Sequence, residues 1–480
     1  MSIRSIAALS FILASGALFA QTDAPAATPV PAEPESPVAA AVHTQPFRIS
    51  EVTYDIRGMT REYPLTQAVE VDRRRVFANR ESLDRYLMDL EIKFLNQRVF
   101  ESASITSEFA PAGDDGVIPV TLTVHTVDTW NIIAVPYPKF DSNSGLTMKL
   151  KLKDFNFLGS MQVLTADVNY QYDENEKSSF EANLDFSIPF KAFEHEFLWD
   201  IDATTGIPLG EVPELNMSTG IDVAIPINFA DLHVGLRQGF SLNDRDDNDE
   251  LYSDDRRYFT EKVYANLPIT LHSFDYLGAL AWTPAVSVAT NWDPTGIVHD
   301  DLKGPDLSVG HSISIGRTDW VSNFRKGFSV SLSNDYGYDL YSGGDISASV
   351  SAEAQGYTCF FDRFGITSRV FGFYNFNDSL SDSGGSKMRG ILNDRLNTNT
   401  AFTLNLDLPV RVMRVNFQEI TGVSWTRYIG FEMHANPFID MAVSHDQEKD
   451  TWFTFEDGWY SGGLEVIVYP MKMRSIYGRI

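Results

Sequence analysis

Arg389 and Gly390 lie in a polar loop that precedes a strand-like segment with an acid. That segment reads AFTLNLDLPV, and its alternation places Asp407 on the face opposite the leucines. A later alternating segment, NPFIDMAV, places Asp440 on the same face as Phe438. The planar guanidinium of an arginine can donate hydrogen bonds to two carboxylates at once. If the loop folds back over these strands, Arg389 can therefore pair with both acids.

This pairing requires neighbouring strands whose acid-bearing faces point the same way, and the sequence contains many alternating segments. From Asn131 to the end of the chain, LTMKLKLK and FEANLDFSI alternate apolar with polar residues, and FSVSLS and ISASVSA repeat the scheme with serine. Such alternation is typical of strands with one apolar and one polar face. We count fifteen or sixteen strands. Roughly 22 residues for each strand and its connection is ample for membrane strands of about 9–11 residues.

The same alternation would also fit a soluble sandwich, in which the apolar faces point inward. Two features favour a membrane barrel instead. The polar faces carry many Lys, Glu, Asp and Ser residues, as a wet lumen allows, and aromatic residues crowd strand ends in NYQY, YGYDLY and FGFYNF. We therefore predict a mainly β fold, with a transmembrane antiparallel β-barrel of about 16 strands over residues 131–480. Asp407 and Asp440 would then face the lumen.

A small α+β unit is predicted before the barrel, over residues 47–128. FRISEVTYDI and IPVTLTVHTV alternate as strands at its two ends, and VFESASITSEF supplies a third strand. Between them, NRESLDRYLMDLEIKFL has apolar residues at helical spacing, and Asn79 is the expected N-cap. The helical face consists of Leu83, Tyr86, Leu87, Leu90 and Phe94.

The N-terminal residues predict export from the cytoplasm. Residues 1–20 have a basic start at Arg4 and a short apolar core, as in a cleaved signal peptide. Residues 21–46 are rich in proline and alanine without apolar periodicity, so we predict a flexible linker. The single cysteine, Cys359, excludes an intrachain disulfide and is interpreted as a small apolar side chain.

Composition and motifs argue against several functional classes. The net charge of −27 is unfavourable for binding nucleic acid, whose phosphates require a basic surface. SDSGG at Ser381–Gly385 lacks spaced His and Asp partners, and the nine histidines form no paired metal spacing. We predict no enzyme activity, no cofactor and no metal site. In the acidic stretch NDRDDNDELYSDD, a calcium loop remains a weak alternative, because its sixth position is Asp249 where glycine is needed. The candidate ligands are Asp244, Asp246, Asn248 and Asp255.

Several short motifs, taken in order, resemble the BamA/TamA superfamily of outer-membrane assembly and translocation barrels. DFNFLGS, with Asp154, Asn156 and Gly159, resembles the D-x-N-x-x-G turn near the start of those barrels. MRGI resembles the V-R-G-F/Y loop motif, and LNLDLPV resembles the acid-bearing strand that follows it. FIDMA resembles F-x-D-x-G, with Ala442 where glycine is usual. Residues 47–128 resemble a POTRA (polypeptide-transport-associated) domain, so the resemblance covers the chain from Phe47 onwards.

The resemblance implies a lumen latch, consisting of Arg389, Gly390, Asp407 and Asp440, in which the arginine anchors its loop inside the barrel. It also implies a role in inserting or translocating client proteins at the bacterial outer membrane, with the N-terminal domain in the periplasm. The partners would be unfolded outer-membrane or secreted clients, outer-membrane lipids and periplasmic accessory proteins. The alternative is a passive pore or surface antigen.

Two features depart from the family pattern. The chain ends in MRSIYGRI, without the aromatic residue that usually completes the last strand. Counting strands from Leu146 also places the Arg389 loop on the periplasmic side of the barrel. The family pattern requires the opposite side, so the count differs from that pattern by one strand. Because of these two features, the sequence does not define how the first and last strands of the barrel pair.

Overall fold

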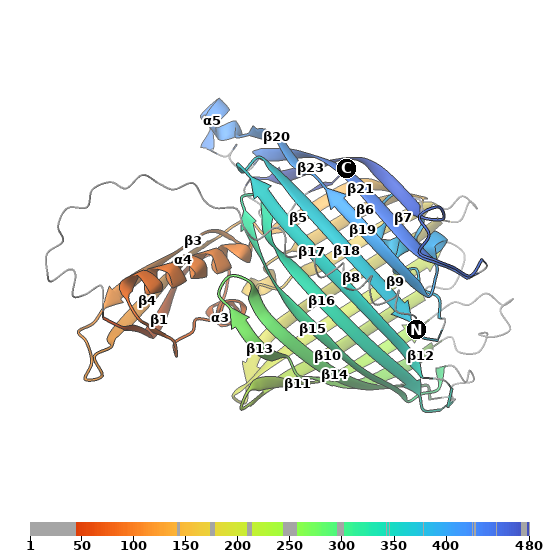
Figure 1. Ribbon diagram of the computed structural model, residues 1–480, viewed down its shortest axis with the longest axis horizontal. Helices are drawn as coiled ribbons and strands as arrows, with labels where there is room; N and C mark the ends of the chain where they lie inside the picture. The colour runs from red at the N-terminus through yellow and green to blue at the C-terminus, as the bar shows by residue number, and fades with distance from the viewer. Residues whose placement is uncertain are drawn as a thin grey trace.

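The computed structural model describes residues 45–479 except for 142–144, 173–177, 209–213, 243–256, 295–301, 342, 345, 378, 425, 427–428, 448 and 472–477. The predicted signal peptide, nearly all of the predicted linker and the acidic stretch with Asp244, Asp246, Asn248 and Asp255 lie outside the described residues. In the part that is described, the chain forms a small α+β domain followed by a large β-barrel (Figure 1).

The N-terminal domain has a four-stranded sheet in the order β2-β1-β4-β3, covered by two helices. Strand β1 is parallel to β4, whereas β3 is antiparallel to β4. The prediction identified β1, β3, β4 and the long helix but missed α3 and β2. The elements are β1 (Phe47–Arg57), α3 (Glu62–Ala68), β2 (Val76–Phe77), α4 (Arg80–Asn96), β3 (Phe100–Phe109) and β4 (Ile118–Asp128).

Helix α4 forms where the sequence predicts a helix. The side chain of Asn79 caps its first turn by accepting a hydrogen bond from the backbone N–H of Ser82 at 2.9 Å, and the hydroxyl of Ser82 returns a bond to the Asn79 backbone. The apolar face of the helix is buried against the sheet, where alternate side chains of β4 form the other half of the core. These helix residues are Leu83, Leu87, Leu90 and Phe94.

The barrel is a closed sheet whose strands follow the order of the sequence. Its strands are β5 (Ile132–Asp141), β6 (Gly145–Asp154), β7 (Leu164–Tyr172), β8 (Ser178–Ala192), β9 (His195–Pro208), β10 (Glu214–Ile227), β11 (Ala230–Leu242), β12 (Arg257–Asn266), β13 (Ile269–Phe274), β14 (Gly278–Trp292), β15 (Asp306–Val321), β16 (Phe324–Asp339), β17 (Ser347–Phe360), β18 (Phe364–Asn375), β19 (Thr400–Asp407), β20 (Val410–Val415), β21 (Phe431–Asp446), β22 (Thr451–Trp452), β23 (Trp459–Pro470) and β24 (Gly478–Arg479). Short helices interrupt the connections: η1 (Phe157–Gly159), η3 (Gly385–Lys387), η4 (Asn393–Leu396) and α5 (Phe417–Thr421).

Several of these labelled strands are parts of one longer strand. Both β12 and β13 pair with β14, both β19 and β20 pair with β21, and both β22 and β23 pair with β21. Over the described residues the barrel therefore has sixteen long strands and the two-residue strand β24, which pairs with β23. The predicted fold class, an antiparallel barrel of about 16 strands behind a small α+β domain, is confirmed.

Strand β5 corrects the predicted position of the Arg389 loop. The count from Leu146 omitted β5, which pairs with β6 along its whole length, from Ile132 opposite Asp154 to Asp141 opposite Gly145. Pro136 and Pro138 obscured this strand, because proline is uncommon inside strands and breaks the sequence pattern. With β5 as the first strand, the loop between β18 and β19 lies at the barrel end away from the N-terminal domain.

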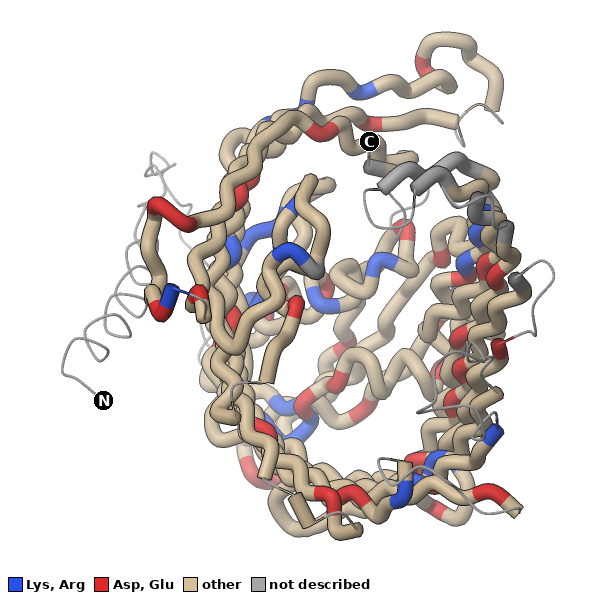
Figure 2. The backbone as a smooth tube through the Cα atoms, turned by 90° about the vertical axis from the view of Figure 1, so that its right-hand side faces the viewer, with Lys and Arg blue, Asp and Glu red and all other residues tan. Residues whose placement is uncertain are grey.

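The apolar faces of the barrel strands point outward, so the soluble sandwich is wrong. On β19, Leu404 is exposed on the outside while Thr403 and Asn405 are buried inside. On β6, Met148 and Leu150 are likewise exposed. This inside-out pattern is typical of barrels embedded in lipid. Acidic and basic residues occur along the strands of the barrel (Figure 2). Among the described residues, no helix has the length and apolar character needed to cross a membrane.

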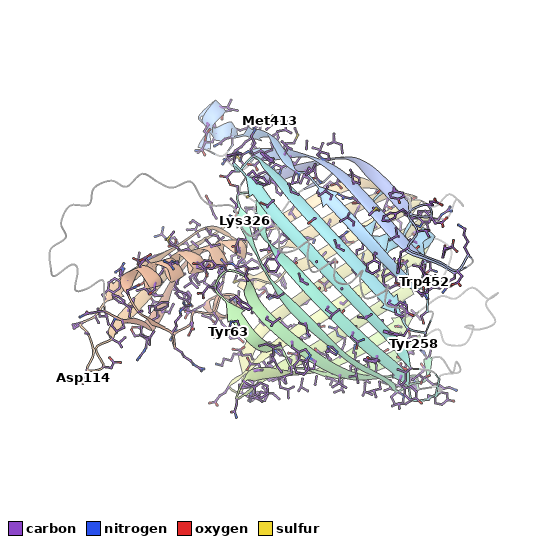
Figure 3. The ribbon with its side chains drawn as sticks, viewed as in Figure 1. Tyr63, Asp114, Tyr258, Lys326, Met413 and Trp452 are labelled. Carbon is purple, nitrogen blue, oxygen red and sulfur yellow. The ribbon has the colours of Figure 1, made fainter. Side chains whose placement is uncertain are left out.

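The N-terminal domain lies against one end of the barrel (Figures 1 and 3). Tyr63 of α3 lies beside the barrel end, and Asp114 lies at the far tip of the domain. Tyr258 and Trp452 mark the opposite end of the barrel. The molecule thus has a domain-side end and a far end, and the loop with Arg389 enters from the far end.

Candidate functional site

The structure brings Arg389, Asp407 and Asp440 together. The guanidinium donates to Asp440 through Nη2 and Nε, at 2.6 and 2.8 Å, and to Asp407 through Nη1 at 2.6 Å. The backbone N–H of Arg389 also donates to Asp440, at 3.0 Å. Asp440 is fully buried, whereas Arg389 keeps 24% of its side-chain surface exposed. Asp440 is therefore bound by both the backbone and the side chain of the loop.

Three further residues complete the lumen latch, and the sequence analysis assigned none of them a contact with Arg389. Glu465 on β23 accepts a hydrogen bond from Nη1 of Arg389 at 3.2 Å. Asn436 on β21 donates to Asp407 and to Glu465, at 2.8 Å each, so it bridges two carboxylates. The guanidinium also lies 3.8 Å from the ring centroid of Phe438, in cation–π geometry. Alternation in LEVIVYP is a signal that could have assigned Glu465 to a lumen face, but only the cross-strand register places it opposite Asn436.

The loop before Arg389 is attached to the barrel wall by a separate polar contact. The carbonyl oxygen of Lys387 accepts hydrogen bonds from Nη2 of Arg369 at 3.1 Å and from Nδ2 of Asn405 at 2.8 Å. Arg369 in turn donates from Nε to the side-chain oxygen of Asn405 at 2.9 Å. These contacts involve β18 and β19, whereas Arg389 contacts β19, β21 and β23, so the loop is fixed to four adjacent strands of the wall.

A small apolar cluster lies between the loop and the inner wall. Met388 and Leu396 of the loop pack with wall residues that are themselves buried, and Ala442 is fully buried among them. The cluster consists of Phe371, Phe373, Met388, Leu396, Ala401 and Ala442. The loop is therefore a packed structural element with its own core.

Gly390 is required for its backbone conformation. Its φ is +72°, in the left-handed region that side chains disfavour, yet no heavy atom lies within 4 Å of the position that a Cβ would take. The lumen latch as a whole has one guanidinium opposing three carboxylates in a partly buried site. It offers no free nucleophile or acid–base pair, and its arrangement suits anchoring of the loop.

The barrel-start motif forms a second polar cluster, at the domain-side end. Asn156 donates from Nδ2 to the Thr60 hydroxyl at 2.8 Å and to Asp128 at 3.3 Å. Its own side-chain oxygen accepts from the backbone N–H of Met161 at 2.9 Å, and its backbone N–H donates to Asp154 at 2.9 Å. The turn between β6 and β7 is thus shaped by Asp154 and Asn156, and it presents Asn156 to the N-terminal domain.

Asp128, at the end of β4, is the centre of this cluster. It accepts hydrogen bonds from the backbone N–H groups of Met59 and Thr60, at 2.7 and 2.9 Å, and from the Thr60 hydroxyl at 2.8 Å. The carbonyl of Gly159 accepts from the Arg61 N–H at 2.9 Å. We call these residues, Met59, Thr60, Asp128, Asn156 and Gly159, the domain junction. The sequence identified the turn as a motif but did not predict that it contacts residues 59–61.

Gly159 permits the close approach of the two backbones. Its φ is +73°, and a Cβ at this position would lie 1.9 Å from the carbonyl oxygen of Met59. Such an overlap requires the backbone to move. Gly159 and Gly390 therefore have similar φ values, but only at Gly159, of these two, would a Cβ also overlap another backbone.

Helix α4 and the turn that follows it form a second attachment between domain and barrel, at the end of β15. Asn96 donates to Asp319 at 2.8 Å and accepts from the Trp320 backbone at 3.0 Å. Arg317 forms an ion pair with Asp89 of α4 at 2.5 Å. The Arg98 guanidinium lies 3.9 Å from the Trp320 ring. Because one attachment is on the turn between β6 and β7 and the other is at the end of β15, they fix the orientation of the domain as well as its position.

SDSGG and Cys359, which the sequence also singled out, lie outside the lumen latch and the domain junction. Ser381 of SDSGG hydrogen-bonds through its hydroxyl to Ser383 at 2.6 Å, and its backbone pairs with Thr398. Cys359 lies on β17 and is partly exposed. Within the described ranges, no group of three or more His, Cys, Asp or Glu side chains is placed to hold a metal ion.

No protein-family model matches the sequence, and no curated protein matches it. Among solved structures, the chain is similar to CdiB from Escherichia coli, at 12% identity and a TM-score of 0.45 over 88% of this chain and 70% of that one. It is also similar to CdiB from Acinetobacter baumannii, at 10% identity and a TM-score of 0.41 over 88% and 74% of the two chains.

A third similar structure is BamA from Haemophilus ducreyi lacking POTRA domains 1–3, at 12% identity and a TM-score of 0.31 over 80% of each chain. Identities and TM-scores this low do not transfer a function.

Proposed function

We propose that this chain is an outer-membrane barrel protein of the BamA/TamA type, which assists the insertion or translocation of client proteins. The observation that carries the proposal is the lumen latch, in which Arg389 binds Asp440 and Asp407 at 2.6 Å and fixes a far-end loop inside the barrel. A passive pore would be obstructed by a loop with its own apolar core. A loop held this tightly suits a barrel that works on proteins at its wall or mouth.

The N-terminal domain would act as the receptor for clients, as a POTRA domain in the periplasm. Its chain order and its sheet, with β1 parallel to β4 and β3 antiparallel to it, suit that assignment. Strand β3 is at the edge of the described sheet, so an extended client could add to it as a further strand. Glu91 of α4 already accepts a hydrogen bond from the Ile105 N–H of β3 at 2.8 Å. A client that pairs along the whole strand would have to displace this side chain.

The domain junction supports the same function by placing the receptor at the barrel end. Asn156 and Gly159 of the barrel contact Thr60 and the backbone of residues 59–61 of the domain. A client captured on β3 would therefore be held close to the domain-side end of the barrel. Neither an enzymatic step nor a cofactor is part of this proposal, so client folding would supply the free energy.

The first experiment is controlled depletion of the protein, followed by quantitation of folded outer-membrane barrels. We expect a broad fall in other barrels before growth slows. Loss of a single exported protein would instead assign a dedicated secretion function. Unchanged barrels with altered solute uptake would contradict the proposal and favour a pore.

Complementation of the depleted cells makes this test specific to the lumen latch. Arg389→Ala should fail to restore barrel assembly at normal protein levels. Arg395→Ala is the matched control, because Arg395 lies in the same loop, is exposed and forms no salt bridge with a described residue. Equal rescue by both variants would separate the latch from the proposed function.

A further inference from the structure

Exposed aromatic side chains recur at the domain-side turns of the barrel. The turns after β8, β10, β13 and β17 each carry one, with exposed fractions between 65% and 90%. These residues are Phe193, Phe229, Tyr276 and Phe361. Aromatic residues concentrate where a membrane meets water, at the level of the lipid headgroups. The four turns therefore mark the headgroup level on this side of the barrel.

An arginine triplet of the N-terminal domain reaches one of these turns. Arg75 forms an ion pair with Asp275 at 3.4 Å, and Asp275 precedes Tyr276. The triplet is held in place by Asp72, whose carboxylate accepts hydrogen bonds from the backbone N–H groups of Arg74 and Arg75, at 2.9 and 3.1 Å. Three consecutive arginines thus lie at the headgroup level in a protein whose net charge is −27.

The triplet borders a cleft of about 1130 Å³ between the domain and the barrel rim. Arg73, Arg74, Arg75, Arg85 and Tyr276 are among its lining residues, together with the acids Glu70, Asp72, Asp89, Asp275 and Asp319. Arg75 is paired with Asp275 and Arg85 with Glu81. Arg73 and Arg74 are exposed and form no salt bridge with any residue that the structure describes. Two arginines therefore remain available to bind an anion in this cleft.

Apolar side chains lie next to this anion-binding surface. Phe274, the last residue of β13, is 38% exposed, and Leu277, in the turn that follows, is 44% exposed. A ligand that satisfies both surfaces has an anionic head and an apolar tail. An acidic peptide would match the arginines but would leave the apolar side chains at the membrane level uncovered.

We infer that this cleft binds the phosphate headgroup of a membrane phospholipid, with Arg73 and Arg74 as the phosphate ligands. Arginine suits this role because its planar fork can donate two parallel hydrogen bonds to one phosphate. The acyl chains would lie along Phe274 and Leu277. The inference shares with the proposed function only the membrane location of the barrel, and it does not depend on any client.

The test measures lipid binding to the purified full-length protein by native mass spectrometry in detergent. The probe is dioleoyl phosphatidylglycerol, and dioleoyl glycerol, which lacks the phosphate, is the matched lipid control. We expect the doubly substituted variant Arg73→Gln/Arg74→Gln to bind phosphatidylglycerol at least tenfold more weakly than the parent. Binding of dioleoyl glycerol should be equally weak in both proteins.

A charge-matched variant controls for general electrostatics. Arg48→Gln/Arg57→Gln removes the same charge from β1 of the same domain, outside the lining of the cleft, and should bind phosphatidylglycerol like the parent. Equal lipid binding by all three proteins would overturn the inference. So would a decaglutamate peptide that binds the parent and is lost in Arg73→Gln/Arg74→Gln while lipid binding is unchanged. The unfolding temperatures of both double variants should match that of the parent, because all four substituted arginines are exposed.

Discussion

The lumen latch and the domain junction are both centred on an aspartate that accepts several hydrogen bonds, but the donors differ. Asp440 accepts from a guanidinium and one backbone N–H, and two further carboxylates contact the same arginine. Asp128 accepts from two backbone N–H groups, a hydroxyl and an amide. The latch therefore depends on charge compensation, whereas the junction depends on the close approach of two backbones.

The difference determines what each cluster tolerates. Removing the arginine from the latch leaves three carboxylates near one another without a cation, which is strongly unfavourable in a partly buried site. Removing a donor from the junction leaves a carboxylate that keeps its other neutral donors, at a cost of about 1–3 kcal/mol. The two clusters also differ at their glycines. A Cβ at Gly159 would overlap a neighbouring backbone atom, whereas a Cβ at Gly390 would have no heavy atom within 4 Å.

The largest effect is expected from Arg389→Ala. Breaking a buried ion pair costs about 3–5 kcal/mol, and partial exposure of Arg389 favours the lower end of that range. We expect a lower unfolding temperature of the purified barrel in detergent, measured by the loss of its folded electrophoretic mobility on heating. Arg395→Ala is the control and should unfold like the parent. An unchanged unfolding temperature for Arg389→Ala would show that the arginine does not stabilise the barrel.

Gly159→Ala should affect the junction and spare the barrel. The added methyl group would overlap the Met59 carbonyl, and relieving such an overlap costs about 1–3 kcal/mol. We expect the domain to separate from the barrel, detected as faster proteolysis between residues 128 and 132, with the barrel's unfolding temperature unchanged. Proteolysis at the parent rate would indicate that the attachment at Trp320 suffices to hold the domain.

A double-mutant cycle distinguishes coupled from independent clusters. Asp440→Ala and Arg389→Ala remove the two sides of one contact, so their effects should deviate from additivity by about 1–3 kcal/mol. Asp128→Ala combined with Arg389→Ala should be additive within about 0.5 kcal/mol, because the clusters share no residues. Unfolding in denaturant, compared across the single and double variants, measures both values. Additivity within the latch pair would argue against the contact seen in the structure.

The smallest effect is expected from Gly390→Ala, which should cost about 1–2 kcal/mol because of its φ alone. Gly390→Asn should cost less, since asparagine tolerates the left-handed region. The same pair of substitutions at Gly159 should not show this rescue, because a Cβ is excluded there for steric reasons. Unfolding temperatures for Gly390 and proteolysis rates for Gly159 provide the comparison. If asparagine were tolerated better than alanine at both glycines, the proposed steric difference between Gly159 and Gly390 would be wrong.

Alternation within single strands made much of the barrel and part of the latch predictable. A residue's face follows from the two-residue period of a strand, so Asp407 and Asp440 could be assigned to the polar faces of their strands. The prediction of a membrane barrel then placed those faces in the lumen. Helix α4 was predictable for a similar reason, because its N-cap and the helical spacing of its apolar residues are also local features of the sequence. It failed for β5, where Pro136 and Pro138 conceal the strand.

The residues that complete each cluster could not be predicted, because they come from segments whose register the sequence leaves open. Glu465 and Asn436 are 29 residues apart and become neighbours only through the pairing of β21 with β23. A shift of that pairing by one residue would turn one of them outward.

The sequence by itself determined which strand faces are apolar, most of the segments that are strands and which loop carries the arginine, since each depends on residues close together in the chain. Only the tertiary structure decided that Asn156 binds Thr60, 96 positions away, and that Arg389 opposes three acids instead of two. Those contacts depend on closure of the barrel and docking of the domain. Such events are stabilised by the whole set of strand pairings, and no single short segment specifies them.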